Sequence, residues 1–123
     1  MNITISTPDM EFHFTLYPKE TYFNRIAGVY AFFIIPDYFL KEVNSSTTHL
    51  TVAEIKWSTL LYIGITNNFQ ARLKNHHKIS PAILLGMTHI GVVKISSGRK
   101  RKTIEKQLLK GYNPPLNQTW MEQ

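Results

Sequence analysis

The segment YIGITNNFQARLKNHH, residues 62–77, carries an arginine and a histidine one helical turn apart. Arg72 and His76 would project from the same face of a helix, because side chains four residues apart are neighbours there. Arg72 also flanks the apolar Phe69 and Leu73, which places it at the border of the buried face, where a cleft would be. A guanidinium held there can bind two phosphate oxygens in parallel and stabilise negative charge that develops on them.

Glu105 is the only acidic residue between residues 55 and 121, a stretch with eleven lysines and arginines. A carboxylate on such a surface would repel a phosphate unless a cation stood between them. Mg²⁺ suits that position, because it takes one or two carboxylates, keeps several waters and binds substrate phosphates. A single metal is expected, since a two-metal site needs several converging carboxylates. The alternative is a surface ion pair with Arg101, contributing roughly a few tenths of a kcal/mol.

Tyr30 and Tyr62 are the tyrosines that end two apolar, β-rich stretches. The simplest interpretation is structural, since tyrosines on strands usually pack their rings and let the hydroxyl reach water. A chemical role as a base faces an obstacle, because a free phenol has a pKa near 10 and is protonated at neutral pH. A nearby cation or proton acceptor would have to lower that pKa or take the proton, and Arg72 is such a cation.

Positive charge is concentrated in the second part of the chain. Residues 1–54 have a net charge of −3 and residues 55–121 a net charge of +10, within a total of +6. Clustered cations favour a polyanion, because they displace counterions from phosphates; a merely solvated basic surface is the alternative. The residues predicted to contact the nucleic-acid backbone are Lys74, His77, Lys78, Arg99, Lys100, Arg101 and Lys102.

Length and composition restrict the class of protein. A chain of 123 residues, 43% hydrophobic, is expected to form one compact domain with a core. The absence of cysteine excludes a disulfide scaffold and a thiolate metal site. The start of the chain does not resemble a signal peptide, and the apolar run AGVYAFFII is too short to span a bilayer. The expected location is therefore cytoplasmic, without membrane contact.

Hydrophobic patterns indicate where strands and helices lie. Residues 11–18 alternate apolar and polar side chains, and Asn67 or Asn68 can cap the helix that follows. The expected strands are 2–6, 11–18, 27–35, 58–66 and 88–97, with a polar loop at 44–49. The expected helices are 37–43, one that contains Arg72, one that starts at Ser80–Pro81, and 103–110. The order predicts an α+β domain with a small three-stranded, mainly antiparallel central sheet flanked by helices.

Three separated motifs resemble the GIY-YIG nuclease superfamily: GVY at 28–30, YIG at 62–64 followed by the helical Arg72, and IEKQLLKGYNPPLN at 104–117. The resemblance covers roughly residues 26–118. It implies a single domain in which a nuclease core at 26–120 carries an N-terminal β extension at 1–25. Most members join the first two motifs by a tight hairpin, whereas here 31 residues intervene. The insertion, about 36–57, is therefore a candidate for substrate choice, a homodimer contact or binding of a partner protein.

The resemblance also implies an activity, the metal-dependent hydrolysis of phosphodiester bonds in DNA by an endonuclease. Tyr30 would act as general base toward water with Tyr62 as its hydrogen-bond partner. Arg72 would stabilise the transition state. Glu105 would bind one Mg²⁺ or Mn²⁺ per active site.

Two further residues have less defined roles in that comparison. His76 would relay a proton or bind phosphate, although a lone histidine is more often structural. Asn117 would fix local geometry by hydrogen bonding or contact the substrate. The alternative function is a non-catalytic nucleic-acid-binding module or subunit with the same basic face, and the residues do not distinguish RNA from DNA.

Overall fold

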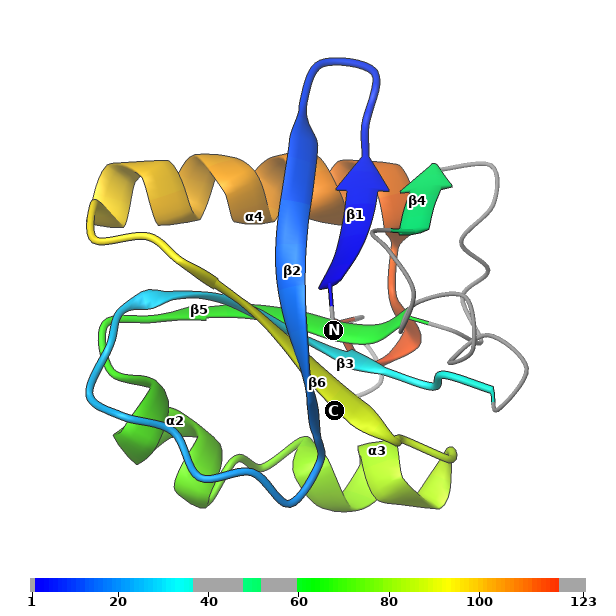
Figure 1. Ribbon diagram of the computed structural model, residues 1–123, viewed down its shortest axis with the longest axis vertical. Coiled ribbons are helices and arrows are strands. Elements are labelled where there is room, and N and C mark those ends of the chain that lie inside the picture. The colour runs from blue at the N-terminus through cyan, green and yellow to red at the C-terminus, as the bar shows by residue number, and fades with distance from the viewer. Residues whose placement is uncertain (1, 37–47, 52–59, 118–123) are drawn as a thin grey trace.

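The computed structural model describes residues 2–36, 48–51 and 60–117 (Figure 1). The strands are β1 (Asn2–Ser6), β2 (Glu11–Pro18), β3 (Gly28–Phe33), β4 (Thr48–Thr51), β5 (Leu60–Thr66) and β6 (His89–Lys94). The helices are α2 (Phe69–Lys74), α3 (Ile79–Leu84), α4 (Gly98–Tyr112) and the short 3₁₀ helix η1 (Pro115–Asn117). None of the helices described is long and apolar enough to cross a bilayer.

The strands form one sheet in the order β4-β1-β2-β6-β3-β5. The pairs β1–β2, β2–β6, β6–β3 and β3–β5 are antiparallel, and β4 runs parallel to β1. The α+β class with flanking helices is confirmed, and β6, β3 and β5 correspond to the three strands expected in the central sheet, although β5 lies at an edge of the six-stranded sheet. The N-terminal strands extend this same sheet, because β2 pairs with β6 at Thr15 and Val92.

The two faces of the sheet bury different helices. Figure 1 shows α4 along one side of the sheet and α2 and α3 along the other. Alternate residues of a strand point to opposite faces, so Val29 and Ala31 pack in the core that contains Leu108 of α4. Tyr30 belongs to the second core, with Phe69 of α2. The β3 strand is buried throughout, which explains its uninterrupted apolar sequence.

Two expected boundaries were wrong. The helix expected from residue 103 begins at Gly98, so the basic run 99–102 forms its first turns instead of a loop. The Ser97 side chain accepts a hydrogen bond from the Lys100 amide and starts the helix, and Lys and Arg are good helix formers. The expected loop at 44–49 overlaps β4, which begins at Thr48.

The remaining differences are smaller. Strands β3 and β6 are each a few residues shorter than expected, and α3 begins at Ile79 with Lys78 at the N-cap position. Of the strand expected at 58–66, residues 60–66 form β5, and residues 58–59 lie outside the described residues. The helix expected at 37–43 lies outside the described residues. Within the 36–57 insertion, residues 48–51 form β4, which pairs with β1 at the edge of the sheet.

Candidate functional site

The glycines of GVY and YIG are required by close approach of other atoms. Gly64 of β5 lies opposite Tyr30 of β3, and the Tyr30 ring and hydroxyl occupy the space that a side chain at Gly64 would fill. At Gly28 the carbonyl oxygen of Val93 and the Phe69 ring occupy that space. The GVY glycine therefore lets β6 and α2 approach β3 closely, and the YIG glycine leaves room for the Tyr30 ring and hydroxyl on β5.

The Tyr30 hydroxyl is the centre of a buried hydrogen-bonded cluster. Its oxygen lies 2.6 Å from Nε2 of His76 and accepts a hydrogen bond from Nε of Arg72 at 3.3 Å. Tyr30 is fully buried, and His76 is 5% exposed. The structure thus brings Arg72 and His76 together on a tyrosine more than forty residues earlier in the chain. They do not share a helical face as expected, because α2 ends at Lys74 and His76 lies in the turn after it.

The proton on His76 can be assigned from its second ring nitrogen. Nδ1 accepts a hydrogen bond from the Lys78 backbone amide at 3.0 Å, so Nδ1 carries no proton. The neutral ring then carries its proton on Nε2 and donates it to the Tyr30 oxygen. His76 is therefore a hydrogen-bond donor to Tyr30, and both of its nitrogens are engaged inside the protein. This leaves neither nitrogen to bind a substrate phosphate.

Burial keeps His76 neutral. Burial, followed by the positive charges of Arg72, His77 and Lys78, lowers the pKa of His76 to about 3. Its ring lies against the Tyr62 ring, with the ring centroids 5.0 Å apart, and the exposed His77 ring stacks on it, also at 5.0 Å. A neutral imidazole between aromatic rings fixes the geometry around Tyr30 without adding charge.

The Tyr30 phenol and the Arg72 guanidinium each affect the pKa of the other. Burial and the neighbouring Tyr62 raise the pKa of Tyr30, and the hydrogen bond from Arg72 lowers it only partly. Burial lowers the pKa of Arg72, but its interactions with Tyr30 and Tyr62 outweigh this, and the net shift is upward. At neutral pH the cluster therefore contains a neutral phenol and a charged guanidinium.

Helix α2 positions Arg72 through its cap and its buried side. The Asn68 side chain accepts a hydrogen bond from the Ala71 amide and begins the helix, as the sequence predicts. Phe69 and Leu73 are buried in the core beneath the sheet. Arg72, between them in sequence, is half-buried at the edge of that core and reaches Tyr30.

Asn117 binds backbone rather than other side chains. Its Oδ1 accepts a hydrogen bond from the Ile63 amide, and its Nδ2 donates to the Ile63 carbonyl, each at 2.8 Å. β5 is an edge strand, so Asn117 supplies the partner that a further strand would give. Because Ile63 lies between Tyr62 and Gly64, we interpret Asn117 as a positioning residue for the YIG motif.

Glu105 projects from α4, on the other face of the sheet from Tyr30. It is half-buried, and burial raises the pKa of its carboxyl group. Among the residues described it has no hydrogen bond or ion pair, and Arg101, the alternative partner, donates instead to the carbonyls of Ile95 and Ser96. The sheet therefore lies between the carboxylate and the Tyr30 cluster, and the β5 edge borders both faces.

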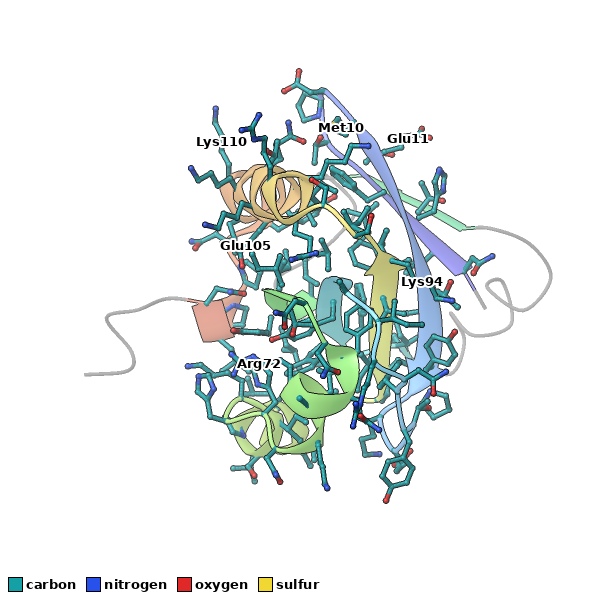
Figure 2. The ribbon with its side chains drawn as sticks, turned by 90° about the vertical axis from the view of Figure 1, so that its left-hand side faces the viewer. Met10, Glu11, Arg72, Lys94, Glu105 and Lys110 are labelled. Carbon is teal, nitrogen blue, oxygen red and sulfur yellow. The ribbon has the colours of Figure 1, made fainter. Side chains whose placement is uncertain are left out.

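Next to the β5 edge, Glu105 of α4 and Arg72 of α2 lie on the same side of the molecule. Figure 2 shows Glu105 and Arg72 on the same side of the molecule, Glu105 above and Arg72 below. No group of three or more histidine or acidic side chains suited to a metal occurs within 2–36, 48–51 and 60–117. An unpaired, half-buried carboxylate fits Mg²⁺ held mainly by water and substrate oxygens.

The predicted nucleic-acid contacts differ in exposure. Lys74, the last residue of α2, and His77, just after that helix, are exposed. Lys100 and Lys102 are exposed on α4. Lys78 is only 8% exposed, which is unsuitable for a surface phosphate contact. The remaining two residues of the predicted set are Arg99, which is exposed, and Arg101, which is half-buried. Lys106 was not among the predicted nucleic-acid contacts. Its position four residues after Lys102, on the same side of a helix, could have indicated it.

The low pKa of His76 predicts acid sensitivity of the fold. An unfolded chain would protonate His76 near its ordinary pKa of 6.5, whereas the folded protein resists protonation down to about 3. Stability is therefore complete above pH 6.5 and falls as the pH decreases, by about 2 kcal/mol at pH 5. Urea denaturation at pH 7 and pH 5 should show this loss in the wild type and a smaller one in His76→Asn. The control His13→Asn changes an exposed histidine on β2 that bonds to Thr4, and it should match the wild type. An unchanged pH dependence in His76→Asn contradicts the assignment.

Comparison with known proteins does not extend this description. The chain matches no protein-family model, no curated protein sequence and no solved structure. The candidate site therefore rests on the geometry of this chain and on its sequence motifs.

Proposed function

We propose that this protein is a metal-dependent endonuclease of the GIY-YIG type that hydrolyses phosphodiester bonds in DNA. The observation that carries the proposal is the Tyr30 hydroxyl, which accepts hydrogen bonds from both Arg72 and His76 in a buried cluster. A tyrosine needed only for packing does not require two such donors. The YIG glycine, opposite Tyr30 and covered by its ring, supports the same interpretation.

In the proposed reaction the oxygen of a water molecule attacks the phosphorus atom. Because the Tyr30 hydroxyl is buried, Tyr30, as the phenolate, takes the proton of that water through an intervening water molecule while the bond from phosphorus to the leaving oxygen breaks. The leaving oxygen is protonated by solvent. The donors Arg72 and His76 stabilise the phenolate, because both bonds strengthen when the oxygen becomes negative. Because the pKa of Tyr30 is raised by burial, the phenolate is a minor form at neutral pH and the rate should increase with pH.

Arg72 has a second role in this scheme. Its Nε–H is engaged by Tyr30, and its two terminal nitrogens carry four further N–H groups. A phosphate at the β5 edge would gain parallel hydrogen bonds from them while charge grows on its non-bridging oxygens. The Tyr62 ring packs against the Tyr30 ring, and Tyr62 also interacts with Arg72. Tyr62 would therefore hold both side chains in position.

Glu105 would hold one Mg²⁺ or Mn²⁺ ion. When bound, such an ion supplies Lewis-acid stabilisation of the phosphate and of the leaving oxygen. The carboxylate is suited to this because it is half-buried and has no partner among the residues described. Its position on α4 requires the substrate to lie across the β5 edge, between α4 and α2.

The alternative is a non-catalytic module that binds nucleic acid through the same basic face. A pure binder needs exposed cations, which the chain has on α4 and beside α2. It does not need a buried tyrosine with two donors or an unpaired carboxylate among cations. These two features favour the enzyme.

The two functions are separated by incubating the protein with plasmid, branched and single-stranded DNA, and RNA, with and without Mn²⁺. We expect metal-dependent cleavage of DNA by the wild type and a loss of about 10²-fold or more in Tyr30→Phe, which lacks the general base. Tyr22→Phe removes an exposed hydroxyl and should retain the wild-type rate. Tight binding without any product would support the module, and full activity in Tyr30→Phe would exclude Tyr30 as the base.

A further inference from the structure

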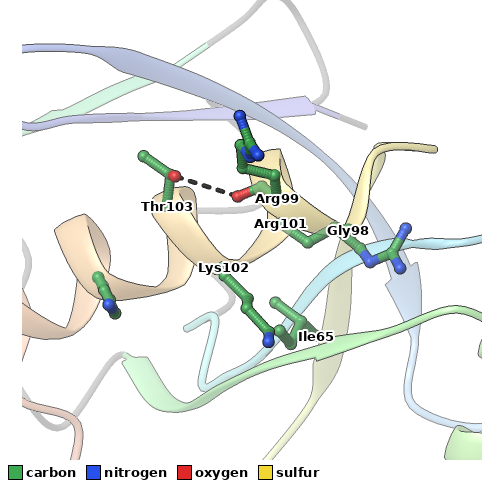
Figure 3. Close-up of a pocket in the computed structure, with 7 residues that line it drawn as sticks. Ile65, Gly98, Arg99, Arg101, Lys102 and Thr103 are labelled. Atoms are coloured by element: carbon green, nitrogen blue, oxygen red, sulfur yellow. Dashed lines mark hydrogen bonds between the residues drawn. The ribbon is translucent and has the colours of Figure 1, made fainter.

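A basic pocket of about 550 Å³ lies between the first turns of α4 and β5 (Figure 3). Its wall on β5 is Ile65, which packs against the core on the α4 face of the sheet. Tyr30 belongs to the core on the other face. Four of its seven lining residues are Lys or Arg and none is acidic. Converging positive charge in a hollow concentrates anions there.

The four cations of the pocket are not equivalent. Arg101 is half-buried, and its Nη1 donates to the Ile95 and Ser96 carbonyls at 3.0 and 2.9 Å. Arg101 therefore fixes the turn that precedes α4. The charged groups of the other three, Arg99, Lys102 and Lys106, are exposed and have no hydrogen bond or ion pair within the described ranges.

These three cations follow one side of α4, because residues 99, 102 and 106 are three and four positions apart. From residue 99 to residue 106 the helix rises about 10 Å, which is the rise of about three nucleotides of a strand. Figure 3 shows Lys102 extending from α4 toward Ile65. An apolar wall beside a row of cations matches the alternating sugar and phosphate groups of a nucleic-acid backbone.

We propose that this pocket binds backbone phosphates of the strand whose cleaved phosphate lies at Arg72. The inference rests on the proposed function for the identity of the strand. The strand crosses the edge of β5, from Arg72 on the α2 side to Lys102 and Lys106 on the α4 side. The sequence of the strand is not read here, because contacts to phosphate position a nucleic acid without specifying bases.

The test is the salt dependence of binding of a fluorescent DNA duplex in EDTA, where no cleavage can occur. In the double variant Lys102→Ala/Lys106→Ala, the slope of log affinity against log salt should fall by about 1.8, which corresponds to two lost phosphate contacts. The control Lys19→Ala/Lys94→Ala removes the same charge away from the pocket and should keep the wild-type slope. All four lysines are at the surface, and urea denaturation checks that both variants fold.

Each outcome has a separate meaning. Equal slopes for the pocket variant and the control would overturn the pocket while leaving the nuclease proposal untouched. A lower slope for the pocket variant together with no cleavage in Mg²⁺ or Mn²⁺ would support the pocket and contradict the nuclease. In a second arm, a mononucleotide replaces the duplex in calorimetry; saturable binding that is lost in the pocket variant would overturn the strand assignment in favour of a free nucleotide.

Discussion

Glu105→Ala should abolish DNA cleavage and leave DNA binding intact or slightly tighter. The carboxylate is the proposed metal ligand, and loss of metal assistance removes several kcal/mol of transition-state stabilisation, which is a loss of at least about a thousand-fold. Binding should not weaken, because removing a negative charge from the basic surface around Glu105 reduces repulsion of phosphate.

The measurement is plasmid cleavage in Mg²⁺ and in Mn²⁺, with affinity for the same DNA determined in EDTA. Glu105→Gln keeps the shape of the side chain and should behave as Glu105→Ala does. Glu11→Gln changes an exposed carboxylate on β2 and should cut at the wild-type rate. Cleavage by Glu105→Ala at the wild-type rate would show that Glu105 is not the metal ligand.

Arg72→Lys should lower the rate of cleavage by about 10² to 10³-fold even though it retains the positive charge. An ammonium group cannot offer the planar pair of donors that a guanidinium directs at a phosphate. It also lacks the Nε–H that donates to Tyr30, so the phenolate loses one of its two donors. A loss of this size is typical when one donor to a developing negative charge is removed.

Single-turnover kinetics at saturating DNA measures this effect on the chemical step. Arg25→Lys is the matched control, because Arg25 is exposed and its Nε donates to the side chain of Gln70. A wild-type rate in Arg72→Lys would mean that only charge is needed at this position. A rate loss of equal size in Arg25→Lys would point to general weakening of the fold rather than to a catalytic role of Arg72.

Local rules were sufficient to predict much of this architecture. Period-two alternation located β2, and apolar runs rich in strand-forming residues located β3 and β5. The capping asparagine expected at Asn67 or Asn68 predicted the start of α2. These features depend on residues close together in the chain, so a single sequence contains them. The expectation that Arg72 and His76 share a helical face was wrong, because α2 ends at Lys74 and Asn75 leaves the helical conformation. His76 reaches Tyr30 from the turn that follows α2.

Features that depend on distant pairing could not be predicted in this way. No local pattern shows that β2 pairs with β6, or that residues 48–51 pair with β1. The use of both Asn117 polar atoms by the Ile63 backbone requires η1 to pass along the β5 edge. The tautomer of His76 depends on the Lys78 amide, which only the turn after α2 brings to Nδ1.

The sheet also separates two groups that the sequence motifs treat as one site. Tyr30 and Tyr62 lie on the α2 face, whereas Glu105 extends from α4 on the opposite face. The separation follows from the alternation of side chains along β3, since Tyr30 points to the α2 face and Ala31 to the α4 face. A single active site therefore requires that Tyr30, Arg72 and Glu105 meet over a substrate at the β5 edge.

Paramagnetic broadening by Mn²⁺ tests that requirement most directly. The sample is the Tyr30→Phe variant with bound DNA, which holds the substrate uncut, and the signals observed by NMR are the side chains of Arg72 and His76. Mn²⁺ should broaden both signals, leave Lys94 sharp, and lose this effect when Glu105→Ala is added. Mn²⁺ that binds through Glu105 but leaves Arg72 and His76 sharp would contradict a single active site across the edge of β5.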